Sequence, residues 1–246
     1  MIRMGSLCVL VAAAVLSAAS TAGAQTPPAQ RWSAEIGIGW DPSISGNINS
    51  GAIGTLNGQT VVILKNSYSD VYGTGLNLRF GGGYMLDNLS EVRVTFTFQS
   101  VSADLTTMGD IGSSRLYAQY GDYQSLGMEI GLRRYANTGR SYRPYAEGLL
   151  GIAFVDKTDI TLAAPQSNVI FSTTDFYDKT AAFTLALNAG LLWQLSDRFD
   201  AFTQLGVRFV TGMSPVDQLG GTGLETINDK SSRWALPIIF GVRARF

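Results

Sequence analysis

The chain has 246 residues, of which 46% are hydrophobic and only 15% are charged. After the first segment no apolar run reaches the roughly 20 residues that a membrane-spanning helix needs, which excludes membrane helices there. The sequence has no histidine, the commonest general base and metal ligand, and its formal net charge of −1 argues against a nucleic-acid partner.

The first 24 residues have the pattern of a secretory signal peptide. Arg3 supplies a positive head, an apolar stretch runs from Leu7 to Leu16, and small residues end at Ala24, where we predict cleavage. Cleavage removes Cys8, the only cysteine, and leaves 17 basic residues (18 less Arg3) against 19 acidic ones. A mature chain without thiols suits an oxidising compartment.

Residues 25–31 contain two prolines and are predicted to form an extended lead-in, and residues 32–246 are predicted to form one domain. Over 32–40 apolar side chains alternate with Ser, Glu and Gly, the pattern of a strand with one apolar and one polar face. The same alternation predicts seven more strands, at 76–84, 91–99, 126–133, 145–154, 182–193, 199–209 and 233–246.

The connections between these strands alternate in length. Those after the second, fourth and sixth strands are short, and the others are long and rich in Gly, Ser, Thr, Asn and Asp. An even number of antiparallel strands with this alternation is typical of outer-membrane barrels. We therefore predict an all-β fold, an eight-stranded antiparallel up-and-down transmembrane β-barrel with short periplasmic turns and long extracellular loops.

The charged side chains of the strands fall on the polar face, which we predict to line the barrel interior. They are Glu35, Arg79, Glu91, Arg93, Glu129, Arg133, Glu147, Asp200, Arg208, Arg243 and Arg245. A soluble lipocalin-like barrel is the alternative, with the apolar face inside. Aromatic residues at both ends of the apolar face, such as Trp32 and Trp40, favour lipid outside because such girdles mark the two membrane interfaces.

The predicted strands resemble those of the small OmpA/OmpX-like, opacity-type outer-membrane barrels over residues 32–246. The closing residues 241–246 are similar to the C-terminal signal that the barrel-assembly machinery reads, with Gly241 and Phe246 at the matching positions. This resemblance implies the outer membrane of a Gram-negative bacterium as the location. It also implies the assembly machinery, outer-membrane lipid and lipopolysaccharide as partners.

The interior of an eight-stranded barrel is just wide enough to be filled by side chains. We therefore expect the inward Arg and Glu residues to form an ion-paired plug, and a narrow channel for ions or small solutes is the alternative. Enzymes among the relatives generally depend on a histidine, so the resemblance implies no catalytic role. The sequence also has no recognised motif for a metal or a cofactor, and we predict none.

All four lysines fall in the predicted outer loops or at their base. Because lysine binds phosphate as a point charge, we expect Lys157, Lys179 and Arg233 to contact lipopolysaccharide at the outer rim, with solvated loop charge as the alternative. The sequence thus predicts a non-enzymatic surface barrel that contributes to envelope integrity and displays loops for adhesion or partner binding. The loops carry no motif that identifies an extracellular ligand.

Overall fold

The computed structural model describes residues 30–56, 58–137, 141–167, 169–170, 173–216, 221–228 and 231–246. The predicted signal peptide (1–24) and most of the predicted lead-in lie outside the described residues. In the part of the chain that is described, no helix has both the length and the apolar character needed to cross a membrane. Nearly all of the regular structure there is strand.

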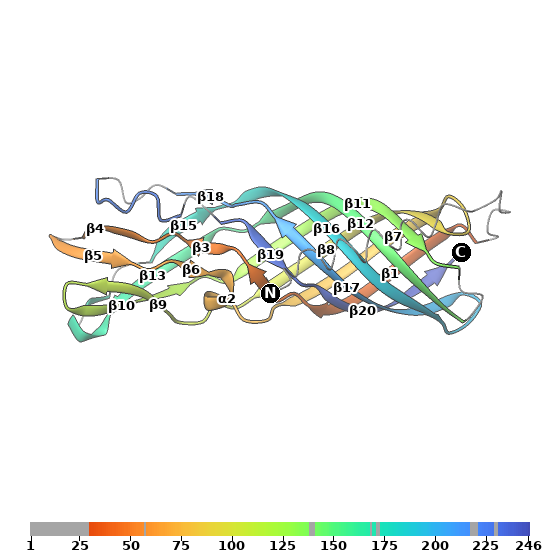
Figure 1. Ribbon diagram of the computed structural model, residues 1–246, viewed down its shortest axis with the longest axis horizontal. Coiled ribbons are helices and arrows are strands. Elements are labelled where there is room, and N and C mark those ends of the chain that lie inside the picture. The colour runs from red at the N-terminus through yellow and green to blue at the C-terminus, as the bar shows by residue number, and fades with distance from the viewer. Residues whose placement is uncertain are drawn as a thin grey trace, which may run out of the picture.

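Eight long strands form a closed barrel (Figure 1). They are β1 (Trp32–Trp40), β7 (Leu76–Met85), β8 (Ser90–Val101), β11 (Tyr123–Tyr135), β12 (Tyr142–Val155), β16 (Thr180–Gln194), β17 (Phe199–Val210) and β20 (Ile238–Arg245). Each pairs antiparallel with its neighbours in the sequence, and β1 pairs with β20 to close the ring. This confirms the predicted eight-stranded up-and-down barrel.

Short turns lie at the end of the barrel where β1 begins and β20 ends. Residues 86–89 join β7 to β8, and residues 195–198 join β16 to β17. The connection from β11 to β12 spans 136–141, of which 138–140 lie outside the described residues. The backbone N–H of Phe246 donates to the carbonyl oxygen of Trp32 at 2.8 Å, which ties the two ends of the barrel together. The four long connections lie at the opposite end, as the sequence predicts.

The two sets of alternating side chains lie on opposite sides of the barrel wall, one inside and one outside. Along β1, Ser33 and Glu35 are buried whereas Ile36 and Ile38 are exposed. The other barrel strands repeat this arrangement, so that apolar side chains cover the outer wall and polar ones fill the interior. A soluble barrel would have its apolar side chains inside and its polar ones outside, so the lipocalin-like alternative is wrong.

Aromatic side chains lie near both ends of the outer wall. The rings of Trp32 and Tyr84 are 4.8 Å apart between centroids near the short turns, and those of Phe209 and Trp234 are also 4.8 Å apart at the other end. Both ends therefore present the amphipathic rings that are typical of the membrane–water interfaces.

The eighth predicted strand, 233–246, is interrupted in the structure. It consists of β19 (Arg233–Ala235) and β20, separated by Leu236 and Pro237. Proline has no N–H to donate to the ladder, which is why the assignment breaks here. The carbonyl oxygen of Pro237 still accepts from the N–H of Gly206 at 3.0 Å, so the same register of pairing with β17 continues on both sides of the break.

The long connections, predicted only as loops, fold into an ordered layer beyond the barrel (Figure 1). Their elements are β2 (Ser43–Ser45), β3 (Asn47–Asn49), β4 (Ala52–Leu56), β5 (Gln59–Ile63), β6 (Asn66–Ser67), α2 (Tyr68–Val71), β9 (Thr106–Ile111), β10 (Ser114–Tyr120), β13 (Thr158–Ala164), the 3-10 turn η1 (Pro165–Ser167), β14 (Val169–Ile170), β15 (Thr174–Asp178) and β18 (Ser214–Pro215). A sheet in the order β18, β15, β13, β10, β9, β5, β4 extends the wall. We call this assembly the outer layer.

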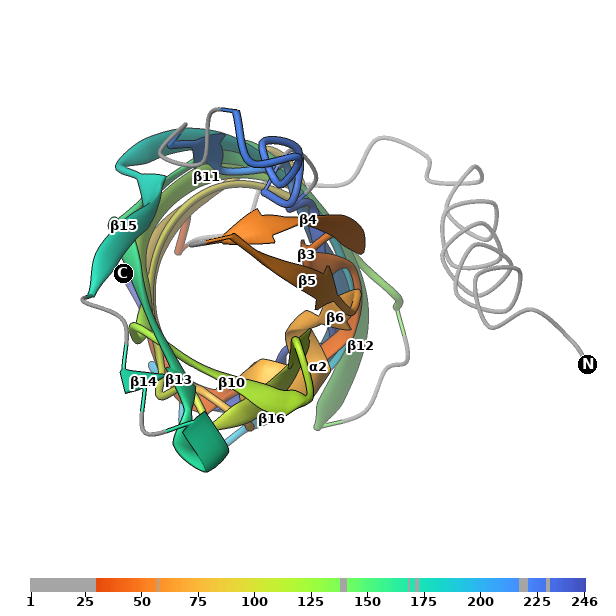
Figure 2. The ribbon, with the colours of Figure 1, turned by 90° about the vertical axis from the view of Figure 1, so that its left-hand side faces the viewer.

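Part of the first connection crosses the mouth of the barrel. The strands β4 and β5 overlap the ring in the end-on view (Figure 2), but they form the far tip of the outer layer (Figure 1). Closer to the barrel, Ile48 of β3 and Val71 of α2 are fully buried, in an apolar core that includes residues of all four long connections. Buried tyrosines anchor it, since the hydroxyl of Tyr68 donates to the carbonyl oxygen of Ser231 at 2.7 Å and that of Tyr120 to Asn49 Oδ1 at 3.0 Å. The outer mouth is thus filled by packed side chains.

Candidate functional site

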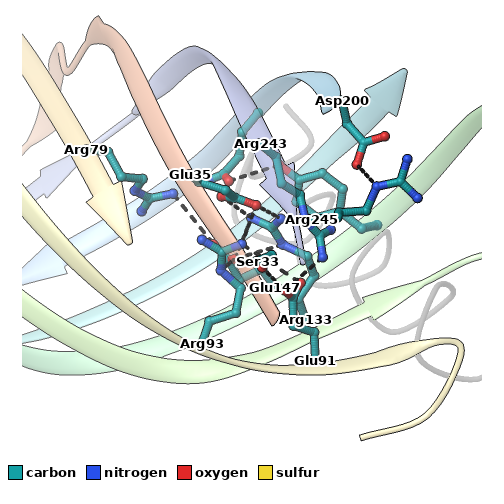
Figure 3. Close-up of polar contacts among 12 residues, drawn as sticks. Ser33, Glu35, Arg79, Glu91, Arg93, Arg133, Glu147, Asp200, Arg243 and Arg245 are labelled. Atoms are coloured by element: carbon teal, nitrogen blue, oxygen red, sulfur yellow. Dashed lines mark hydrogen bonds and ion pairs between the residues drawn. The ribbon is translucent and has the colours of Figure 1, made fainter. Parts of the chain in front are cut away.

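The charged residues predicted to line the interior lie inside the barrel, and all except Arg245 are buried (Figure 3). Seven of the eight barrel strands contribute the charged side chains, and β16 contributes a neutral partner, Asn188. The network draws on residues far apart in the sequence, because closure of the barrel brings its first and last strands together. We refer to these charged residues as the interior network.

Glu147 and Glu35 occupy the centre of the interior network. The carboxylate of Glu147 lies 2.8 Å from Arg133 Nη2, 3.0 Å from Arg93 Nε and 3.5 Å from Arg79 Nη1. Arg93 and Arg133 each also pair with Glu35, so two carboxylates are held between two guanidinium groups. Bidentate pairing of this kind suits the planar guanidinium group.

Glu91 anchors the end of the network nearest the short turns. Its carboxylate lies 2.9 Å from Arg243 Nη2 and accepts hydrogen bonds from the hydroxyls of Ser33 and Tyr135. The Tyr135 hydroxyl in turn accepts a hydrogen bond from Arg243. Carboxylate, phenol and guanidinium therefore form a closed triangle of contacts.

Glu129 forms the end of the network nearest the outer layer. Arg208 Nη2 lies 3.0 Å from its carboxylate and Arg79 Nη2 lies 3.9 Å away. Arg208 also donates to Thr97 Oγ1 at 3.2 Å. At the opposite rim Asp200 pairs with Arg245 at 3.1 Å.

The geometry indicates a plug rather than a pore lining. Each carboxylate of the interior network has at least one guanidinium partner, as burial requires, because an isolated buried charge costs several kcal/mol or more. Glu129 and Glu147 are each paired with arginine side chains. Among the described residues no cluster of His, Cys, Asp or Glu could hold a metal ion.

Sequence reasoning did not single out the aromatic members of the plug. Tyr145 lies against Arg133, whose guanidinium carbon is 4.0 Å from the ring centroid, and its hydroxyl donates to Gln204 Oε1 at 3.1 Å. Tyr135 lies similarly beneath Arg143 and Arg243. The strand alternation could have predicted their inward position, because Tyr135 and Tyr145 share the inward parity of the charged residues on β11 and β12.

The three cations predicted at the outer rim differ in their exposure to solvent and in their partners. Lys157 and Lys179 are exposed, but both are already paired: Lys157 with Asp159 and Asp175, and Lys179 with Asp156 at 3.2 Å. Lipopolysaccharide contact for these two remains a prediction.

The prediction for Arg233 is wrong. Its side chain is only 3% exposed and points inward, where it lies 3.8 Å from the Asp41 carboxylate, donates to Ser43 Oγ at 2.7 Å and lies over the ring of Tyr123. The physical reason is the strand alternation. Arg233 precedes the outward Trp234 and therefore faces the interior, where it joins the first and last long connections.

The two residues of the predicted assembly signal lie on β20 and just after it. Phe246 is 66% exposed, next to Trp32 at the rim of the short turns. Gly241 faces inward, and a Cβ there would come within 2.2 Å of the Ile36 carbonyl oxygen and 2.5 Å of the Phe202 ring. A larger residue at 241 would therefore clash with the wall. Recognition by the assembly machinery stays a prediction.

Comparison with known proteins identifies the fold. No protein-family model matches the sequence, and no curated protein matches it significantly. A solved major outer membrane protein from Thermus thermophilus superposes with a TM-score of 0.52 at 16% identity, covering 89% of this chain and 100% of that chain. Neisserial surface protein A gives 0.46 at 12% identity (87% and 97%), and the Escherichia coli outer membrane protease OmpT gives 0.43 at 6% identity (92% and 99%).

The chain therefore has the fold of the small outer-membrane barrels that its sequence resembles. The Thermus structure and the closed ring of eight strands both support this fold. The apolar outer wall must be covered by lipid, because a closed barrel with this surface satisfies its backbone hydrogen bonds internally and exposes hydrocarbon. This agrees with the outer-membrane location predicted from the sequence.

Proposed function

We propose that this outer-membrane barrel is closed and non-enzymatic, that it contributes to envelope integrity, and that it displays its outer layer to an extracellular partner. The interior network is the observation that carries this proposal. Its fully buried ion pairs occupy the lumen, and the first connection crosses the outer mouth above them. Two closures in series support a closed barrel over the narrow-channel alternative.

The non-enzymatic part of the proposal rests on the chemistry of the interior. The sequence has no histidine, and the buried carboxylates that could act as acids or bases are engaged by arginine. The similarity to an outer membrane protease has a low TM-score and carries no weight for activity. We therefore assign the carboxylates to structure.

The display part rests on the order of the outer layer. A flexible loop would suffice to connect two barrel strands, yet these connections form a sheet with its own apolar core. Rigid elements hold binding groups in place at a lower entropic cost than flexible loops do. The outer layer is therefore suited to presenting a fixed surface for adhesion or partner binding.

Single-channel recording tests the closed barrel. The refolded chain is placed in planar bilayers beside an interior variant, Glu129→Ala with Glu147→Ala, and an outer-wall control, Leu150→Ala. We expect the parent and the control to be silent. Steady openings of the parent that the interior variant alters, but the control does not, would make the channel alternative the better description.

A further inference from the structure

A small pocket lies at the end of the barrel that carries the short turns, at the edge of the interior network. Its volume is about 30 Å³, and it is lined by Ser141, Arg143, Leu192, Gln194, Asp200 and Arg245. Asp200 and Arg245 form the ion pair that lies apart from the central carboxylates in Figure 3. The pocket is therefore on the periplasmic side, far from the outer layer.

The strand pairing gives this pocket fixed walls. Arg143 on β12 is in register with Leu192 on β16, and Gln194 on β16 is in register with Asp200 on β17. The backbone N–H of Gln194 donates to the carbonyl oxygen of Ser141 at 2.9 Å, so the end of β16 is tied to the residue that precedes β12. Leu192 is buried and supplies an apolar wall.

Arg143 differs from the other inward arginines in its partners. Among the described residues, every other inward arginine of the barrel strands pairs with an Asp or a Glu, whereas Arg143 has no carboxylate within ion-pair distance. Its Nη2 donates to the carbonyl oxygen of Asn88 at 2.6 Å, and its guanidinium carbon lies 4.5 Å from the centroid of the Tyr135 ring. These contacts orient the guanidinium group and leave N–H donors for a further acceptor.

The pocket has an excess of positive charge. Arg245 Nε lies 3.1 Å from the Asp200 carboxylate, and Arg245 Nη2 donates to the carbonyl oxygen of Ser196 at 3.0 Å. The two arginines that line the pocket, less the one aspartate, leave one positive charge without a counter-charge. An anion that enters the pocket would compensate this charge, because an unpaired charge in a partly buried site is costly.

The size and charge of the pocket select the kind of anion. Its volume is close to the roughly 30 Å³ that one water molecule occupies in the liquid, so only the head of a ligand can enter. A carboxylate is small, carries one charge and pairs with a guanidinium group through two parallel hydrogen bonds. A doubly charged phosphate exceeds the single unbalanced charge and is repelled by Asp200.

We propose that this pocket binds the carboxylate of a periplasmic molecule. Arg143 is the main donor to the carboxylate, Arg245 is the second, and the rest of the molecule lies outside the barrel. The carboxylate can belong to a small free acid or to the C-terminus of a peptide. This site adds a periplasmic ligand to a function that concerns the interior and the outer layer, and it does not require a closed interior.

An NMR titration of the refolded full chain in detergent micelles tests the proposal. The probes are acetate, N-acetyl-alanyl-alanine, the C-terminal amide of the same dipeptide and inorganic phosphate. We expect both acids to shift the backbone amide signals of Arg143 and Gln194 saturably, whereas the dipeptide amide leaves them unchanged. A dipeptide acid that binds more tightly than acetate indicates a peptide terminus, and equal affinities indicate a small free acid.

Three variants separate the site from the general charge of this end of the barrel. Arg143→Gln keeps most of the side-chain volume and should weaken acetate binding by about tenfold, the effect of one lost charge-assisted hydrogen bond. Asp200→Asn removes the negative charge of the pocket and should tighten binding, a gain that structural damage does not produce. Arg198→Gln removes a turn arginine that does not line the pocket and should bind acetate like the parent.

Several results would overturn the proposal. Signals that do not shift saturably with either acid would show that the pocket takes water alone. Equal affinity of the parent and Arg143→Gln for acetate, or equal shifts with the dipeptide acid and its amide, would exclude carboxylate recognition by Arg143. Tighter binding of phosphate than of acetate would exclude selection for a single charge. If Arg143→Gln does not fold, Asp200→Asn decides, since weaker acetate binding by that variant would refute the site.

Discussion

Replacement of Glu147 by alanine probes the interior network at its centre. The side chain is fully buried and its carboxylate contacts Arg133 at 2.8 Å, Arg93 at 3.0 Å and Arg79 at 3.5 Å. Asn188 donates to it at 3.1 Å. Arg133 and Arg93 retain Glu35 after the substitution, but Arg79 keeps only Glu129 at 3.9 Å. The variant therefore leaves buried positive charge without adequate compensation.

Breaking one buried ion pair from one side costs about 3 to 5 kcal/mol. Because two of the three arginines keep another carboxylate, we expect a loss of about 3 kcal/mol in the free energy of unfolding, the lower end of that range. Urea unfolding from lipid vesicles, followed by tryptophan fluorescence, measures it. Glu147→Gln retains the volume and one acceptor and should lose less, whereas the exposed Glu225→Ala should unfold like the parent.

An unfolding free energy of Glu147→Ala within about 1 kcal/mol of the parent would refute this reasoning, because a loss that small is typical of an exposed ion pair. The carboxylate would then have to be solvated in the native barrel. That result would also refute the description of the interior as an ion-paired plug.

Two further predictions concern the outer layer. Arg233→Ala removes the buried link to Asp41 and Ser43, so trypsin should cut at Lys65 in the first connection faster than in a Lys157→Ala control, and equal cleavage would contradict this role. Burial raises the pKa of Tyr68 and Tyr120, whereas an unfolded tyrosine has a pKa of about 10. Their neutral phenols thus stabilise the layer fully below about pH 10 and progressively less as the pH rises towards their folded pKa values. Phenolate absorbance should show a late phase coincident with unfolding, and one phase near pH 10 for all tyrosines would argue against a buried core.

The period-two pattern was enough to predict the eight barrel strands and which face of each strand points outward to lipid. Strand alternation is a local property: a residue such as Glu35 between Ala34 and Ile36 must face opposite to both of them. The charge of one parity and the apolar character of the other then decide which face meets lipid. For the same reason the inward position of Arg233 could have been read from its place beside Trp234.

The partners of each charge and the order of the long connections were decided by the tertiary structure. Glu35 meets Arg133 because the ring closes and its strands tilt, and neither closure nor stagger is contained in a local pattern. Ile48 and Tyr68 lie in segments without clear periodicity, and their burial depends on contacts with the other three connections. A sequence pattern records what each residue prefers locally, whereas these contacts exist only once distant segments have come together in the fold.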